Sequence, residues 1–168
     1  QKNKGYGNAL KEGLEKIETE FFCIINADGS MDPKYLEEMR KLCVNKDLVF
    51  ASRYQKPGGG SDDDDFVTII GNAVFTFLGN FLFKLKISDI LYTYILGKTS
   101  SFQKLDLKNY DFRICVEIPI RAKILNMEYS CIPSYERERI GGKKKVNAIK
   151  DGLLILSEIV KYFYKSKK

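Results

Sequence analysis

A short apolar run at residues 21–25, FFCII, constrains the fold most, because it lies between two segments with helical patterns. Its length and composition are typical of a buried strand. Residues 5–18 repeat apolar side chains at helical spacing, and a second helix is expected to begin at Asp32-Pro33, since proline fits the first helical position. Another short strand is expected at 48–52. The order helix, strand, helix, strand predicts an α/β sheet with parallel members.

Three glycines, a serine and four aspartates, GGGSDDDD, occupy residues 58–65. A like-charge run of this kind predicts a solvated, mobile loop, and ordering of the loop on ligand binding is the alternative. Further elements are expected after it: helices at 67–87, 117–125 and 146–164, and strands at 92–95, 100–104 and 130–132.

Composition narrows the functional classes. The 168 residues have the length of one domain, and 44% of them are apolar, enough for a sizeable core. Four cysteines lie far apart and histidine is absent, which argues against a zinc site and a dense disulfide framework and favours buried thiols in a reducing cytoplasm. The net charge of +6 favours anionic partners, namely phosphate groups, acidic lipid or nucleic acid. We find no uncharged apolar stretch of bilayer-spanning length.

Asp28 follows the first apolar run directly, on a turn at the expected carboxyl edge of the sheet. Open α/β sheets bind ligands at that edge. A carboxylate with Asn26 and Ser30 beside it suits a hard divalent cation that bridges two phosphates. The alternative is an ordinary Asp-Gly turn between elements.

Cations gather near the end of the chain, where Arg139 and the run of lysines at 143–145 flank two glycines. Glycines let the backbone approach a ligand closely, and the cations can pair with phosphate oxygens. The alternative is a solvated face that attracts anions without specificity. Arg53 ends another expected strand at the same edge, where it is either a ligand or a surface residue.

The order of these motifs resembles the family 2 glycosyltransferases of the dolichol-phosphate mannose synthase type. Seven blocks in sequence order carry the likeness: NKGYGNALKEGL, FFCIINADGSMDP, LVFASRY, the helix bearing Asn72, the ISD segment ending at Asp89, the helix led by Glu117, and IPSYERERIGGKKKV.

This resemblance implies a GT-A-like α/β fold, Rossmann-like, with a mixed, mostly parallel sheet flanked by helices. It implies one catalytic domain over residues 1–168 that lacks its first strand and nucleotide-base pocket, so the fragment alone is expected to be inactive. The polar opening, QKNKGYGN, agrees with a start in mid-domain. The implied activity is inverting transfer of a mannose or glucose-like sugar from a nucleotide-diphosphate sugar to a polyprenyl phosphate.

The resemblance also assigns roles. Asp28 would be the principal ligand of Mg²⁺ or Mn²⁺, with Asn26 and Ser30 at the other metal positions. Arg53, Arg139 and Lys145 match positions that bind donor phosphates or line the site, and Asp89 matches an acidic residue near the donor sugar. Arg139 and Asp89 are the catalytic candidates. A phosphate acceptor needs no strong general base, whereas a hydroxyl acceptor would need one, and Asp89 is then the candidate.

Departures from the family pattern keep two rivals open. Asn26 replaces the first motif aspartate, Ile95 stands where the family has an arginine, and the DDDDF run replaces another arginine. These changes favour a catalytically silent relative that binds nucleotide sugar or anionic lipid. A nucleic-acid-binding domain is the other rival, but the basic segment KKKVNAIK has no aromatic residues for base stacking, so no nucleic-acid partner is expected.

The expected helices at 67–87 and 146–164 carry more apolar side chains than one packed face needs, with lysines near their ends. Interfacial helices combine these features against anionic headgroups. We therefore expect a peripheral protein on the cytoplasmic face of a membrane, and the alternative is that both helices pack in the core.

Overall fold

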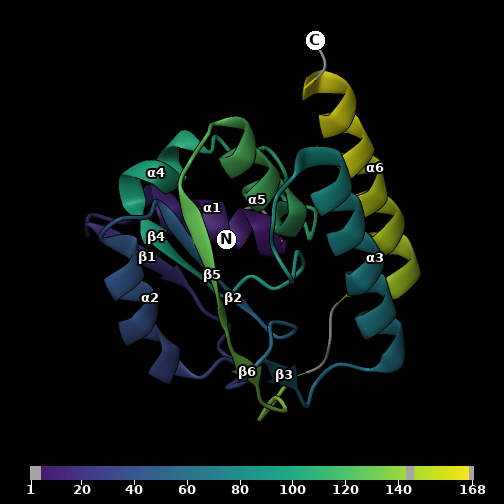
Figure 1. The fold of residues 1–168 in the computed structure, drawn as a ribbon, viewed down its shortest axis with the longest axis horizontal. Helices are drawn as coiled ribbons and strands as arrows, with labels where there is room; N and C mark the ends of the chain where they lie inside the picture. Colours follow the sequence, from purple (N-terminus) through teal and green to yellow (C-terminus); the bar gives the residue numbers. More distant parts are fainter. Residues whose placement is uncertain (1–4, 143–145, 167–168) are drawn as a thin grey trace.

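A four-stranded sheet forms the centre of the computed structural model, which describes residues 5–142 and 146–166 (Figure 1). Its strand order is β1 (Phe21–Ile24), β4 (Ile95–Lys98), β2 (Leu48–Ser52) and β5 (Tyr129–Pro133). β4 pairs antiparallel with β1 and β2, and β5 pairs parallel with β2. β1, β2 and β5 therefore share one direction, so their carboxyl ends lie at the same edge. The predicted mixed sheet is confirmed.

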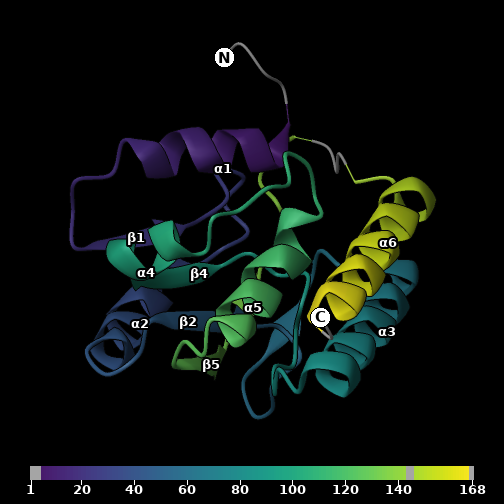
Figure 2. The same ribbon diagram turned by 90° about the horizontal axis from the view of Figure 1, so that it is seen from above.

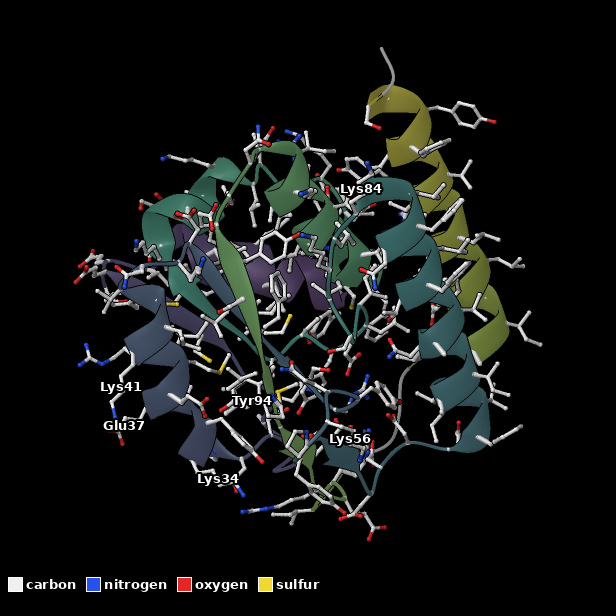
Figure 3. All side chains as sticks on the ribbon, in the orientation of Figure 1. Lys34, Glu37, Lys41, Lys56, Lys84 and Tyr94 are labelled. Atoms are coloured by element: carbon white, nitrogen blue, oxygen red, sulfur yellow. The ribbon has the colours of Figure 1, made fainter. Side chains whose placement is uncertain are left out.

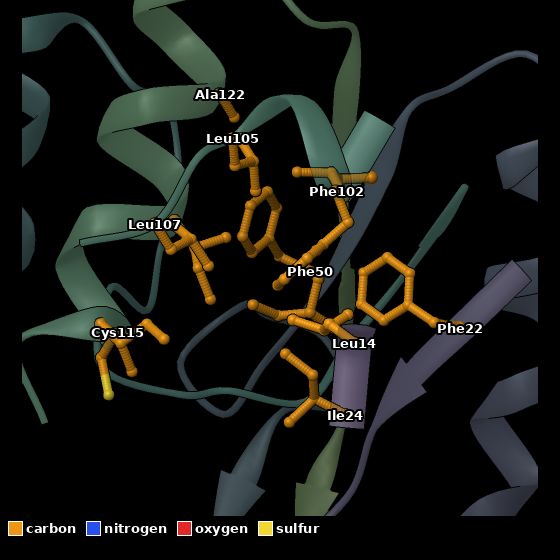
Figure 4. Packing of buried hydrophobic residues seen from close by; sticks show 13 residues of the cluster. Leu14, Phe22, Ile24, Phe50, Phe102, Leu105, Leu107, Cys115 and Ala122 are labelled. Atoms are coloured by element: carbon orange, nitrogen blue, oxygen red, sulfur yellow. The ribbon is translucent and has the colours of Figure 1, made fainter. Parts of the chain in front are cut away.

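Helices cover both faces of the sheet. The helices α1 (Tyr6–Glu15), α4 (Thr99–Lys104) and α5 (Ile114–Ile124) pack on one face, where Phe22, Phe50 and Phe102 meet in the core (Figure 4). The helix α2 (Leu36–Cys43), which follows the 3₁₀ turn η1 (Pro33–Tyr35), covers the other face.

Polar and apolar positions of α2 separate as an amphipathic helix requires. Glu37 and Lys41 of α2, and Lys34 of the turn before it, point into solvent (Figure 3). Met39 and Cys43 on the opposite side of α2 are buried in one core cluster with Tyr94. The Tyr94 hydroxyl donates to the backbone oxygen of Asp32 at 2.9 Å, and the Asp32 side chain accepts from a backbone N–H of the following turn at 3.0 Å. The predicted helix start at Asp32-Pro33 is confirmed.

The helices α3 (Phe66–Phe83) and α6 (Ala148–Ser166) lie side by side at one side of the domain and run in the same direction (Figure 2). Near their carboxyl ends the rings of Phe83 and Phe163 meet edge to face, with centroids 6.3 Å apart. α3 ends at Lys84, which adopts the left-handed conformation that closes many helices.

α3 corrects one expectation from the sequence. Its 18 residues carry no charge and have a mean hydropathy of 1.8, so by length and composition this helix could cross a membrane. Polar residues within it, such as Asn72 and Thr76, interrupt the apolar run, so the sequence alone did not indicate a helix of bilayer-spanning length. The same side chains make hydrogen bonds on the buried side of the helix.

The acidic segment at 58–65 is not the solvated loop that was expected. Strand β3 (Gly60–Ser61) within it pairs parallel with β6 (Tyr135–Glu136) to form a second small sheet. A Cβ atom on Gly60 would lie 2.6 Å from Tyr135 Cε2, so any larger residue would displace the Tyr135 ring. Carboxylates of the run pair with arginines, which removes the repulsion that predicted a mobile loop.

Two expected strands are also wrong. Residues 100–104 belong to α4. Two tertiary contacts stabilise this helix: the Phe102 and Phe22 rings meet edge to face with centroids 4.2 Å apart, and Ser101 Oγ donates to Asp47 Oδ1 at 2.6 Å. The strand expected at 92–95 begins only at Ile95. The other expected helices and strands occur where the sequence predicted them, within a few residues at their ends, whereas β3 and β6 were not predicted.

Candidate functional site

The carboxyl edge of the sheet brings the main candidate residues together. Asp28 follows β1, Arg53 follows β2, and Arg139 follows β6, while Asp89 lies on the segment that leads into β4. Arg53 forms an ion pair with Asp89, and the Arg139 side chain lies 3.9 Å from that of Asp28.

Arg53 lies at the centre of a buried network of carboxylates. Its Nε and Nη2 donate to the two oxygens of Asp89 at 2.8 and 3.0 Å, and Nη1 donates to Asp64 at 3.0 Å and to Glu136 at 3.1 Å. The guanidinium also lies 4.5 Å from the ring centre of Tyr92. Burial alone would lower the pKa of Arg53, but the Asp89 carboxylate raises it well above its usual value. All three guanidinium nitrogens are therefore held by protein carboxylates.

Asp89 is 2% exposed, and both of its oxygens accept from Arg53. The backbone on both sides of Asp89 is held by α3: Asn72, Thr76 and Asn80, spaced one turn apart, hydrogen-bond to the backbone of residues 87, 90 and 91 at 2.7 to 3.2 Å. The polar side of this apolar helix thus positions the segment that carries Asp89.

Arg139 has a more open environment. Its Nε donates to Asp63 Oδ1 at 3.0 Å, its Nη2 donates to Asp63 Oδ2, and its Nη1 lies 3.9 Å from Asp28 Oδ2. The side chain is 24% exposed. The hydrogen bond to Asp63 raises the pKa of Arg139, which stays charged at every physiological pH.

The turn at Asp28 is fixed from two sides. Ser30 donates to Asp28 Oδ1 through its backbone N–H at 3.1 Å and its hydroxyl at 2.8 Å. The backbone N–H of Ile140 donates to the Asp28 carbonyl at 2.8 Å, and its side chain covers Gly29, which has a φ of +82°. The segment after β6 is thereby tied to the turn after β1.

This turn suits a divalent cation that is bound partly by the protein and partly by a substrate. Within residues 5–142 and 146–166, no group of three acidic or thiol side chains is placed to cage a metal ion. Asp28 offers one carboxylate, and Asn26 lies two residues before it. Ser30 orients the carboxylate through its hydroxyl. Mg²⁺ and its relatives are commonly held by one or two carboxylates plus substrate phosphates, so this donor set is suitable.

A cleft of about 190 Å³ opens between these residues and the amino-terminal ends of α3 and α6. Its walls include polar groups from the sheet edge and side chains from four helices: Asn26, Arg53, Asp63, Asp64, Glu136 and Arg139, with Tyr6, Thr68, Cys115 and Ile155. Burial raises the pKa of Glu136, and Arg53 opposes that shift.

Sequence reasoning missed three acidic residues of this site. Asp63 and Asp64 belong to the run interpreted as solvated, and Glu136 lies in a strand that no pattern indicated. The replacement of a family arginine by the acidic run was the available signal for the first two. Lys145, predicted to bind phosphate, lies outside the residues that the structure describes.

Comparisons with known proteins agree with this architecture. The model of the family described as glycosyl transferase family 2 matches residues 1–106. A structure of glucosyl-3-phosphoglycerate synthase from Mycobacterium tuberculosis with Mn²⁺, uridine-diphosphate-glucose and phosphoglyceric acid is similar, with a TM-score of 0.69 and 10% identity over 96% of this chain and 56% of that one. Its complex with uridine diphosphate gives a TM-score of 0.62 at 11% identity, with the same coverage. The chain thus spans about half the length of these proteins, and the predicted GT-A-like fold is confirmed.

Proposed function

The chain belongs to glycosyl transferase family 2, and we propose that its full-length protein transfers a sugar from a nucleotide-diphosphate sugar to a polyprenyl phosphate. The transfer would invert the sugar, require Mg²⁺ or Mn²⁺, and occur on the cytoplasmic face of a membrane. The synthase from Mycobacterium tuberculosis, which shares the fold, was crystallised with Mn²⁺ and uridine-diphosphate-glucose.

Asp28 and Arg139 support the donor part of the proposal. Their side chains lie 3.9 Å apart at the edge of the sheet where ligands of α/β proteins bind. A cation held by Asp28 would neutralise the charge that develops on the leaving nucleoside diphosphate. Arg139 would hold an oxygen of the same diphosphate through its guanidinium fork.

A strip of exposed apolar side chains on α3 and α6 carries the acceptor part of the proposal. It is formed by Phe66, Val67, Ile70, Val74, Phe77, Phe81, Ile149, Leu153, Leu156 and Val160. Phe77 and Phe81 are 65% and 71% exposed, and their rings stack on each other on the outer side of the helix. A contiguous apolar strip of this length on a solvent-exposed surface marks an interaction site.

The helices that carry the strip also border the cleft, since Thr68 of α3 and Ile155 of α6 line the cleft. An acceptor with its apolar chain in or on a bilayer and its phosphate in the cleft fits this arrangement. Lys84, Lys86 and Lys165 near the ends of these helices suit anionic headgroups.

A phosphate acceptor also agrees with the state of Asp89. Both oxygens of this carboxylate accept hydrogen bonds from Arg53, so it is poorly placed to remove a proton from a hydroxyl. A phosphate is already an anionic nucleophile at neutral pH. The role of Asp89 would then be to hold Arg53 and the segment at the cleft.

Vesicle co-sedimentation of the full-length protein tests the surface. It should pellet with vesicles of acidic lipid, and less so at high salt, because screening weakens the lysine contribution. Phe81→Glu should reduce pelleting, whereas Val44→Glu, at a residue 66% exposed beside α2, should not. Equal pelleting of both variants, or none by the parent protein at low salt, would exclude this surface as the lipid contact.

A silent relative that binds nucleotide sugar or anionic lipid is the second candidate, and two observations favour it. Asn26 offers a neutral ligand in place of a carboxylate. Ile95, at the position of a family arginine, is 1% exposed in the core of the sheet, so no cation reaches the cleft from there. Release of nucleoside diphosphate by the full-length protein with donor and polyprenyl phosphate would decide between the candidates.

A further inference from the structure

The proposed sugar transfer gives no role to the acidic run at 62–65. Two of its carboxylates nevertheless pair with the two arginines of the cleft. Asp63 receives two parallel hydrogen bonds from Nε and Nη2 of Arg139. Asp64 receives one from Nη1 of Arg53. A guanidinium uses the same fork of two donors to hold a phosphate. The bound Asp63 carboxylate therefore occupies the donors that a substrate phosphate would take.

The residues before the run explain how it reaches the cleft. A Cβ atom on Gly59 would lie 2.4 Å from the backbone oxygen of Gln55, so the chain can make this close turn only with glycine. Ser61 Oγ then accepts from the backbone N–H groups of Asp63 and Asp64, both at 3.2 Å, and donates to Glu136 at 2.8 Å. This turn directs two successive carboxylates toward the two arginines.

The two carboxylates differ in how firmly they are held. The Asp64 side chain is 3% exposed and also accepts from the Tyr54 hydroxyl at 2.5 Å, so it belongs to the buried network around Arg53. The Asp63 side chain is 9% exposed, and its partner Arg139 is 24% exposed. A competing anion can reach the Asp63–Arg139 pair from the cleft without breaking the buried network.

We propose that Asp63 is an internal phosphate mimic, which occupies Arg139 until the diphosphate of the donor displaces it. This inference rests on the proposed function, since it takes a nucleoside diphosphate with its divalent cation as the competing ligand. Arg139 Nη1 lies 3.9 Å from Asp28, so the mimic lies beside the candidate metal ligand, where that diphosphate is expected. Displacement exchanges the partner of Arg139 and breaks no covalent bond.

An internal competitor reduces the apparent affinity of a ligand. The intrinsic affinity is multiplied by the fraction of molecules in which the competitor has left the binding site. A partly exposed ion pair is weak, so its removal should tighten diphosphate binding by about fivefold. Salt screens the pair, so the gain should shrink at high ionic strength. Asp63 would thereby set the donor concentration at which the site fills.

Titration calorimetry of the full-length protein with UDP and with GDP, each with Mn²⁺, tests the proposal. Asp63→Asn should bind the preferred nucleotide about fivefold more tightly than the parent at low salt, with a smaller gain at high salt. Asp62→Asn is the matched control, because it removes the same charge from the same run. Among the contacts described, the Asp62 side chain accepts only from the exposed Tyr135 hydroxyl, and its backbone bond to Glu136 does not depend on the side chain. It should leave the affinity unchanged.

A third arm assigns the effect to Arg139. In the Arg139→Ala background, Asp63→Asn should give no further gain, because the two residues act as a pair. Equal or weaker binding by Asp63→Asn than by the parent, or an equal gain from Asp62→Asn, would overturn the inference and leave the proposed function standing. Absence of UDP and GDP binding in every protein would overturn both.

Discussion

Arg53 and Arg139 lie at the same edge of the sheet, both paired with aspartates, but their surroundings give them different roles. Arg53 is 6% exposed and meets Asp89, Asp64 and Glu136. The Arg139 side chain is 24% exposed and meets Asp63, with Asp28 farther away. A fully paired, buried cation holds its neighbours in place, whereas a partly exposed one can exchange partners. Burial and the number of partners, and not the residue type, separate the two.

The largest expected effect sharpens the structural side of this comparison. Arg53→Met would leave three buried carboxylates without their cation, and removal of one partner from a buried ion pair lowers the free energy of unfolding by about 3–5 kcal/mol. Urea denaturation at pH 7 measures this loss. A loss below about 1 kcal/mol would show that Arg53 is not the centre of a stabilising network.

Arg139→Ala should have the opposite profile. The loss of a partly exposed pair should change the free energy of unfolding by less than about 1 kcal/mol. Transition-state stabilisation should fall by about 2–4 kcal/mol, because a desolvated phosphate charge would be left unpaired. Turnover of the full-length protein measures it, and activity within threefold of the parent would make Arg139 a surface charge.

Much of this contrast lay beyond the sequence. Local patterns predicted β1, β2 and β5 as short strands and every helix except α4, because short apolar runs and helical spacing of apolar residues are both visible in the sequence. They could not predict that GGGSDDDD folds back beside Tyr135 and Glu136, since that pairing joins segments about 75 residues apart. The sequence placed Asp28 and Arg53 at one edge of the sheet, and the family resemblance assigned Asp89 and Arg139 to the same donor site. Which arginine is saturated depends on long-range contacts alone.

The third prediction concerns the helix that supports Arg53 through Asp89. Asn72→Ala would leave the part-buried backbone N–H of Leu91 without its acceptor, which lowers the free energy of unfolding by about 1–3 kcal/mol. Val74→Ala, on the outer side of the same helix and 49% exposed, should lower it by less than about 0.5 kcal/mol. Equal effects of the two substitutions would show that α3 does not position this segment through its polar side.

The smallest effect is a pH dependence. Burial raises the pKa of Glu136 above 4.5, so its folded state binds a proton more tightly than its unfolded state. Its contribution to stability is therefore full below about pH 4.5 and is lost as the pH rises through the raised value. Glu136→Gln removes this loss, so the difference in unfolding free energy between variant and parent should shift in favour of the variant from pH 4 to pH 7. A difference that is constant with pH would contradict the assignment.

Metal-dependent donor binding through Asp28 is the most direct test of the proposed function. The full-length protein should bind UDP-glucose or GDP-mannose with Mn²⁺ and lose most of that affinity in a chelator. Asp28→Asn keeps an acceptor for Ser30 but removes the charge, so Mn²⁺-dependent affinity should fall at least about tenfold with little change in thermal stability. Asp106→Asn, the same change in a loop after α4, should bind as the parent does. Undiminished Mn²⁺-dependent binding by Asp28→Asn would contradict the account.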